Sequence, residues 1–138
     1  MAMTKNNGKD AERAFLARLK RPGVVVERIR DQGDLRALNR GRAVADFKKP
    51  ADFLVTEDGV LSYREVKSVQ SSTSFPFSNI EDGQRSAALR QAAVGGPYFF
   101  HLFSFGLGKW FIMSAQKFRD VIDSGKSSVK FKDLPEWQ

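Results

Sequence analysis

The chain has 138 residues, which is enough for one domain with a real core and too few for two. It contains no cysteine and a single histidine, which excludes a disulfide scaffold, a thiolate zinc site, a Cys nucleophile and a His-rich metal site. With 41% hydrophobic residues, the sequence predicts a globular protein. It has no apolar run as long as a membrane span and no signal-peptide core, so we expect a soluble, cytoplasmic protein without a membrane partner.

The net charge of +7 is concentrated in one segment. Residues 20–49 hold nine basic and four acidic side chains, which leaves +5 on this stretch. Such a patch favours a polyanionic partner, most simply nucleic acid, although an ordinary basic surface loop would have the same composition. The side chains predicted to contact DNA here are Arg28, Arg30, Arg36, Arg40, Arg42, Lys48 and Lys49.

The N-terminal half begins with a predicted amphipathic helix. From Gly8 to Lys20, the side chains of Glu12, Phe15, Leu16 and Leu19 share one stripe. Glu12 either lies exposed at the helix start, where a carboxylate suits the helix dipole, or points into an active site. A strand follows from Val24, and the stretch of about 28–49 is interpreted as a long loop or basic arm, a length that is unusual unless the loop is functional.

A hairpin follows the basic arm and carries the candidate chemistry. Residues 52–55 and 60–69 are predicted strands, joined by a turn at 57–59 that contains Asp58-Gly59, a strong hairpin signal. Because side chains alternate along a strand, Glu65 and Lys67 share a face, and the hairpin brings Asp52 beside them. Two carboxylates suit Mg²⁺ or Mn²⁺, and a lysine beside them can hold a phosphate or position a water. Metal-assisted phosphodiester hydrolysis uses carboxylates and a lysine of this kind. A Glu-x-Lys pattern is also common on solvent-exposed strand faces.

The segment of residues 68–78 is predicted to be a polar loop with an aromatic anchor. The hydroxyls of Ser71 and Thr73 are placed to touch phosphate oxygens. A capping box with Ser78 at the N-cap and Glu81 at N3 predicts a helix that runs to about residue 94. Gln84, near the start of this helix, either reaches the catalytic pocket, caps a strand or faces solvent.

The last third of the chain is predicted to supply the centre of the sheet. Residues 98–105 form an apolar strand with aromatics on both faces, and residues 109–113 form its partner. His101, within the first of these strands, is interpreted as a packed core residue rather than a catalytic base. Ser114 caps a helix over 115–124, and residues 126–138 form a basic tail.

The order of these motifs resembles the PD-(D/E)xK nuclease superfamily. The resemblance is carried by Gly8 and Glu12 on the first helix, by Asp52, by Glu65-Val66-Lys67, and by the run from Thr73 to Ile80 that leads to Gln84. Within the superfamily, the chain is most similar to the RecU-type Holliday-junction resolvases and more distantly to the archaeal Hjc type. The similarity covers most of residues 8–123, with Pro-Ala-Asp at residues 50–52 in place of the usual Pro-Asp.

This resemblance implies an α/β, restriction-endonuclease-like fold with a central mixed β-sheet flanked by helices, and one nuclease domain over 1–138. It implies that Asp52, Glu65 and the backbone carbonyl of Val66 bind Mg²⁺, with Mn²⁺ as a plausible substitute. Glu12 would complete the acidic cluster directly or through water, Lys67 would orient the attacking water, and Gln84 would support Lys67 or the scissile phosphate. The implied partner is DNA with a four-way junction, cut by a homodimer.

Three functions are therefore compatible with the sequence. The first is a Mg²⁺-dependent endonuclease that resolves Holliday junctions and enters the junction with the basic segment of residues 28–49, which is shorter than the corresponding projection of RecU proteins. The second is a nuclease of the same superfamily that cuts duplex or flap DNA in restriction or repair. The third is a basic nucleic-acid-binding module without catalysis, in which the acidic cluster is incidental.

Overall fold

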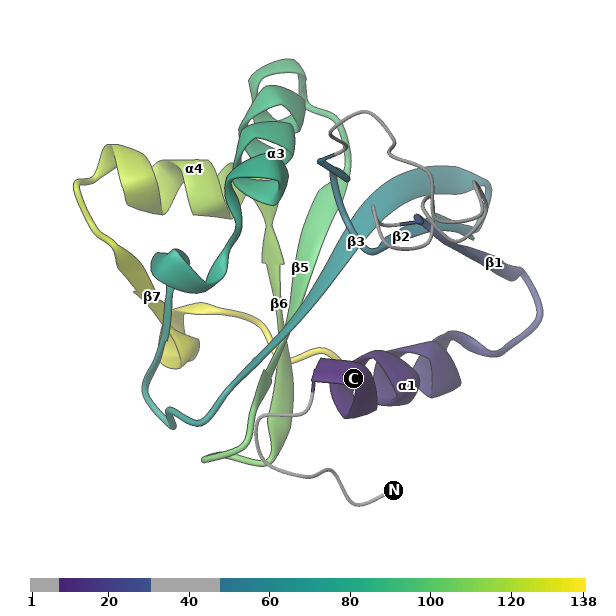
Figure 1. Ribbon diagram of the computed structural model, residues 1–138, viewed down its shortest axis with the longest axis horizontal. Coiled ribbons are helices and arrows are strands. Elements are labelled where there is room, and N and C mark those ends of the chain that lie inside the picture. Colours follow the sequence, from purple (N-terminus) through teal and green to yellow (C-terminus); the bar gives the residue numbers. More distant parts are fainter. Residues whose placement is uncertain (1–7, 31–47) are drawn as a thin grey trace, which may run out of the picture.

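The computed structural model describes residues 8–30 and 48–138, and it is built around one mixed β-sheet (Figure 1). The sheet has the strand order β1-β2-β3-β5-β6, and only the β3–β5 pair is parallel. Its strands are β1 (Val24–Arg28), β2 (Phe53–Glu57), β3 (Val60–Val69), β5 (Tyr98–Ser104) and β6 (Lys109–Ser114). The predicted α/β architecture with a central mixed sheet is confirmed.

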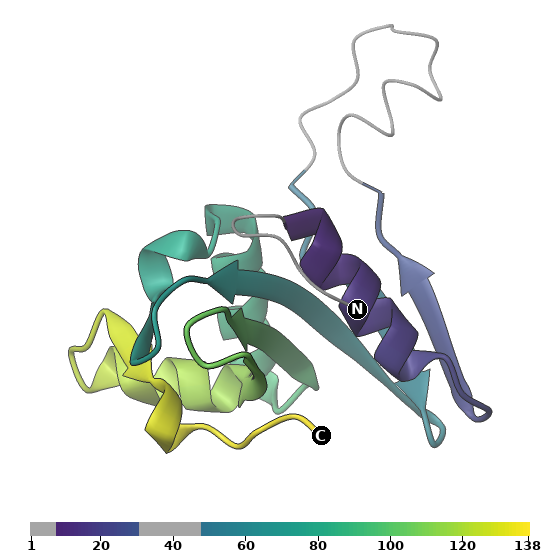
Figure 2. The same ribbon diagram turned by 90° about the horizontal axis from the view of Figure 1, so that it is seen from below.

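Helices cover both faces of this sheet (Figure 2). Helix α1 (Gly8–Leu19) packs with Phe15 against Phe53, Val55 and Val66 on one face. Helices α3 (Asp82–Val94) and α4 (Ala115–Asp123) pack against the other face, over the ends of β5 and β6. The first helix therefore agrees with the prediction within one residue, although Leu16, expected on its buried stripe, is 39% exposed.

The predicted hairpin is present and explains the position of the acidic residues. Asp58 and Gly59 both have positive φ angles, 53° and 80°, as a two-residue type I′ turn requires. The turn pairs Glu57 with Val60 and sets the register of the whole hairpin. Because of that register, the residue just before β2, Asp52, lies next to the middle of β3.

Helix α3 begins later than predicted. Its N-cap is Glu81 and the capping box joins Glu81 to Gln84, whereas Ser78 lies in a short 3₁₀-helix, η1 (Phe77–Asn79). Glu81 is not one of the residues that usually open a capping box, so the sequence pattern favoured Ser78. The end of the helix is as predicted, with Gly95 in a left-handed conformation, φ 73°.

Two segments expected to be a loop and a tail form a small second sheet. Strand β4 (Ser74–Pro76) pairs antiparallel with β7 (Ser128–Lys130), which is followed by a second 3₁₀-helix, η2 (Phe131–Asp133). Phe75 and Phe131 are buried there. These partners are more than fifty residues apart, and three-residue strands leave no periodicity in the sequence. The local pattern therefore shows only polar residues with an aromatic anchor.

The remaining elements agree with the sequence within one or two residues. Ser114 caps α4 as predicted, with its hydroxyl accepting from the Lys117 N–H at 3.1 Å. Of the basic arm predicted at 28–49, residues 31–47 lie outside the described residues. Within the described ranges, no helix is long and apolar enough to cross a membrane.

Candidate active site

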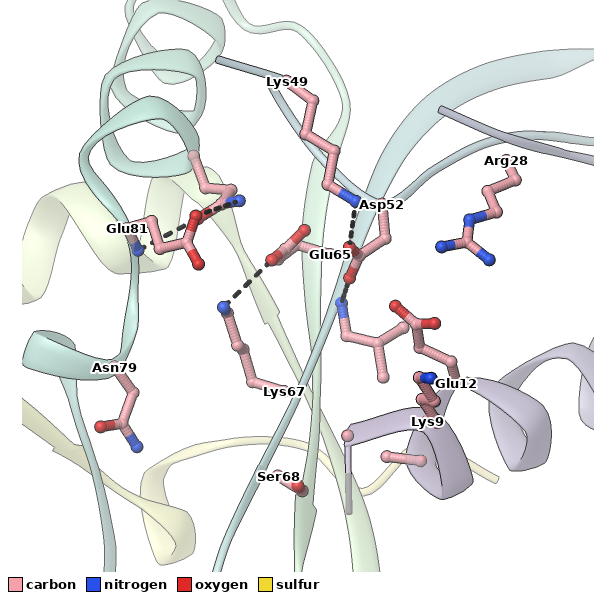
Figure 3. A pocket seen from close by; sticks show the side chains of 14 residues that line it. Lys9, Glu12, Arg28, Lys49, Asp52, Glu65, Lys67, Ser68, Asn79 and Glu81 are labelled. Carbon is pink, nitrogen blue, oxygen red and sulfur yellow. Dashed lines mark hydrogen bonds and ion pairs between the residues drawn. The ribbon is translucent and has the colours of Figure 1, made fainter. Parts of the chain in front are cut away.

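A cavity of about 740 Å³ opens between the start of α1, the middle of β3 and the start of α3 (Figure 3). Every residue predicted to be catalytic lines it, together with several residues that the sequence did not single out. The lining consists of Gly8, Lys9, Ala11, Glu12, Arg28, Lys49, Asp52, Glu65, Val66, Lys67, Ser68, Asn79, Glu81 and Gln84. The structure thus brings the predicted acids and Lys67 into one cavity from three separate elements.

Asp52 is held by contacts on both carboxylate oxygens. Its Oδ2 accepts a hydrogen bond from the backbone N–H of Val66 at 3.0 Å, and its Oδ1 lies 3.1 Å from Nζ of Lys49. Asp52 is buried, with 7% of the residue's surface exposed. The bond to Val66 is a consequence of the hairpin register, and it aligns the Asp52 carboxylate beside Glu65.

Glu65 is the most deeply buried charged residue of the cavity, with 1% of its surface exposed. Its Oε2 lies 3.4 Å from Nζ of Lys67, whereas its Oε1 has no hydrogen-bond partner among the described residues. Burial, reinforced by the negative charge of Asp52, raises the pKa of Glu65 well above its usual range, and Lys67 opposes this shift. A buried carboxylate oxygen without a partner is costly, so this position favours a cation.

The donors present fit a hard divalent cation. Mg²⁺ is commonly held by one or two carboxylates and keeps several waters, so the carboxylates of Asp52 and Glu65 suit such an ion. The share of the Val66 carbonyl in the site stays a prediction. Among residues 8–30 and 48–138, no three Asp, Glu, His or Cys side chains group closely enough to hold an ion. Glu12 is therefore not a third direct ligand in this structure, although it lines the same cavity and points into it from α1 (Figure 3).

Lys49 does not have the environment expected of a free DNA-binding lysine. Its side chain is only 18% exposed and is paired with Asp52. Burial alone would lower the pKa of Lys49, but the charge of Asp52 and the hydrogen bond to it outweigh burial, and the net shift is upward. The sequence signal for this ion pair is the spacing of three residues between Lys49 and Asp52, which was not used in the prediction.

Gln84 is buried at the back of the cavity and is engaged with Glu81. Its Oε1 accepts from the Glu81 backbone N–H at 3.0 Å, and its Nε2 lies 3.4 Å from Oε2 of Glu81. Its side chain caps α3 in the structure, so any support it gives to Lys67 or to a phosphate stays a prediction. Asn79 and Glu81 also line the cavity; the sequence pattern placed them in the first turn of the predicted helix and gave them no role in the site.

The predicted DNA-binding residues are divided among several environments. Arg28 lines the cavity, and Arg30 and Lys48 are exposed. Ser71 accepts hydrogen bonds at 3.1 Å from the backbone N–H groups of both Thr73 and Ser74, so its hydroxyl shapes the loop. The remaining predicted residues lie outside the described residues; they are Arg36, Arg40 and Arg42.

The sheet order, the helices on its two faces and the acidic hairpin define a restriction-endonuclease-like α/β fold. The chain is similar to the solved structure of Hjc from Archaeoglobus fulgidus, a Holliday junction resolvase from an archaeal hyperthermophile. The similarity covers 94% of this chain and 95% of that chain, with a TM-score of 0.58 and 15% sequence identity. No protein family model and no curated protein matches the sequence. At this identity, the similarity establishes the fold.

Proposed function

We propose that this protein is a metal-dependent DNA endonuclease that resolves four-way junctions. The observation that carries the proposal is a buried acidic cluster. Asp52 lies near Glu65 in the same cavity, Glu65 Oε1 has no hydrogen-bond partner among the described residues, and Glu65 Oε2 contacts Lys67. Arg28 and Lys9 line the same cavity and supply positive charge for a phosphodiester backbone. The fold shared with Hjc supports a junction as the substrate.

In this proposal, different residues of the cavity bind the metal, orient the attacking water and bind the phosphate. Asp52, Glu65 and the Val66 carbonyl would hold Mg²⁺ or Mn²⁺. A bound ion of this kind polarises a phosphoryl oxygen and lowers the pKa of a bound water. Lys67 orients the attacking water and stabilises the negative charge that develops on the phosphate, because its ammonium is held beside Glu65 at 3.4 Å. Arg28 binds a non-bridging phosphate oxygen from the opposite wall.

The Asp52→Asn variant tests whether the acidic pair is catalytic. It keeps the size of the side chain and an acceptor for the Val66 N–H but removes the charge that binds the metal. We expect cleavage of a synthetic junction in Mg²⁺ to fall by roughly 10³-fold or more, while the variant still binds the junction in EDTA. Cleavage at the wild-type rate would contradict the proposal, and a wild-type protein that binds but never cleaves would be the non-catalytic module.

Competition between substrates separates a resolvase from a nuclease that acts on duplex or flap DNA. We expect a labelled four-way junction to be displaced by unlabelled junction at concentrations at least tenfold lower than by linear duplex or flap DNA. Resolution by a homodimer would produce paired, symmetric nicks, and its mass in solution would be twice that of the chain. Binding should weaken as salt rises, because phosphate contacts dominate such complexes.

In the competition experiment, equal affinities for junction, duplex and flap DNA would assign the second function, a nuclease that acts on duplex or flap DNA.

A further inference from the structure

Lys49 forms an ion pair with Asp52, the candidate metal ligand. Its Nζ lies 3.1 Å from Asp52 Oδ1, and the side chains of both residues are largely buried, with 18% and 10% exposure. Figure 3 shows the end of the Lys49 side chain next to the Asp52 carboxylate, with Glu65 between this pair and Lys67. A divalent ion bound by Asp52 and Glu65 and the ammonium of Lys49 would therefore compete for the same carboxylate.

The backbone that carries Lys49 is anchored independently of this ion pair. The Tyr98 hydroxyl donates to the carbonyl of Pro50, and Ala51 is fully buried. Residues 48–50 form a strap whose backbone also lies close to Gly83, where an added Cβ would be 3.4 Å from the Lys49 carbonyl oxygen. The lysine side chain can thus leave Asp52 without the strap losing its position.

We propose that Lys49 is an exchangeable counter-ion: it neutralises Asp52 in the metal-free protein and is released to a substrate phosphate when a divalent ion binds. The inference rests on the proposed function for the identity of the ligands. Its physical basis is charge balance. Without the metal, two adjacent carboxylates repel each other, and Lys49 and Lys67 each hold one of them. With the metal bound, the cation neutralises Asp52 in place of Lys49. The Lys49 ammonium is then available at the edge of the cavity, where the backbone of DNA would pass.

The first test measures the affinity of the protein for Mg²⁺ alone, by titration calorimetry without DNA. Lys49→Met removes the competing charge and keeps the aliphatic length, so we expect Mg²⁺ to bind roughly five- to tenfold more tightly than to wild type. Lys49→Arg should keep the wild-type affinity. Lys48→Met is the matched control, because it removes the same charge from the adjacent, exposed position, and we expect less than about a twofold change.

The second test measures release of the lysine. In wild type, Ca²⁺, used as a non-catalytic probe, should increase junction affinity both by neutralising the carboxylates and by freeing Lys49. In Lys49→Met, the increase caused by Ca²⁺ should be smaller by about fivefold, because there is no lysine to release. Lys49→Met is thus expected to bind Mg²⁺ more tightly and to show a smaller effect of Ca²⁺ on junction affinity. A loss of folding would not raise the affinity for Mg²⁺, and thermal melts in EDTA verify that the variant is folded.

The outcomes separate the inference from the proposed function. Mg²⁺ binding that is unchanged or weaker in Lys49→Met overturns the inference and leaves the metal site in place. An unchanged effect of Ca²⁺ on junction affinity overturns the release step. If neither wild type nor variant binds Mg²⁺ at millimolar concentration, both the inference and the metal-dependent function fail.

Discussion

At the scale of single residues, the cavity is built at the expense of stability. Glu65 is buried with one oxygen lacking a partner in the described part of the chain, and Asp52 lies beside it. Proteins that bury unpaired charged groups for function commonly become more stable when those groups are replaced. This gives a test of the site that does not require activity.

Glu65→Gln should stabilise the metal-free protein. The pKa of Glu65 is raised in the folded state above its ordinary 4.5, so its favourable contribution is complete below pH 4.5 and is lost as the pH rises through the raised value. We expect the variant to exceed wild type by about 1–2 kcal/mol in EDTA at pH 8 and by less at pH 5. Urea unfolding at the two pH values measures this. A larger advantage at pH 5 than at pH 8 would contradict it.

His101 has the opposite dependence on pH. It is fully buried, and its Nε2 lies 2.9 Å from the guanidinium of Arg64, which can only donate. Burial, and then the positive charges of Arg64 and Arg18, lowers the pKa of His101 well below its ordinary 6.5. The unfolded chain therefore binds the proton more readily, and stability that is complete above pH 6.5 is lost as the pH falls.

The predicted consequence is a loss of up to about 1.4 kcal/mol per pH unit below 6.5 from this residue. His101→Gln, which does not titrate, should lose less stability than wild type between pH 7 and pH 5. Unfolding free energies at pH 7, 6 and 5 provide the measurement. Parallel curves for the two proteins would show that His101 is not the group responsible. The expectation that this histidine is packed in the core is confirmed by its burial.

At the scale of elements, helix α3 shows how capping and the site depend on each other. The residues that begin the helix, Glu81 and Gln84, also line the cavity beside Lys67. Capping therefore fixes where the back wall of the cavity stands. Both polar atoms of the Gln84 side chain contact Glu81 in this arrangement.

Gln84→Ala should destabilise the protein by about 1 kcal/mol, because both hydrogen bonds of the Gln84 side chain to Glu81 are lost, one of them a bond of the capping box. Gln116→Ala is a suitable control, since Gln116 makes one exposed contact, to Asp120 at 3.1 Å within α4, and should cost only about 0.3 kcal/mol. Chemical denaturation distinguishes the two. Equal losses would mean that the box does not stabilise α3.

At the scale of the whole molecule, the C-terminal segment ties together elements from both ends of the chain. The ring of Trp137 packs against Phe15 of α1, His101 of β5 and Trp110 of β6, with centroid distances of 5.5, 4.3 and 5.4 Å. Its carbonyl accepts a hydrogen bond from Arg18 at 2.7 Å. Helix α1, which carries Glu12 into the cavity, is thus held in place by the C-terminal segment.

Trp137→Ala should destabilise the fold by about 2–3 kcal/mol, because a large aromatic is removed from a partly buried cluster. Hydrogen exchange should show the largest loss of protection in α1. Leu107→Ala, in the β5–β6 turn with 41% exposure, serves as the control and should change stability by less than about 0.5 kcal/mol. A loss of protection spread evenly over the sheet would argue against a specific role in holding α1.

The sequence by itself determined the hairpin and the placement of its charged residues. Asp58-Gly59 specifies a turn whose register is local, and strand alternation then places Glu65 and Lys67 on one face and Asp52 beside them. Periodicity likewise identified α1, β5, β6 and α4, because each buries a continuous apolar face.

Only the tertiary structure decided the features that depend on distant partners. These are the pairing of β4 with β7, the choice of Glu81 rather than Ser78 as the helix cap, and the packing of Trp137. The ion pair of Lys49 with Asp52 belongs with them, because a sequence records the charge of a lysine but not whether its strap turns that charge toward solvent or into the cavity. Burial and pairing are properties of two segments at once, and local pattern describes only one of them.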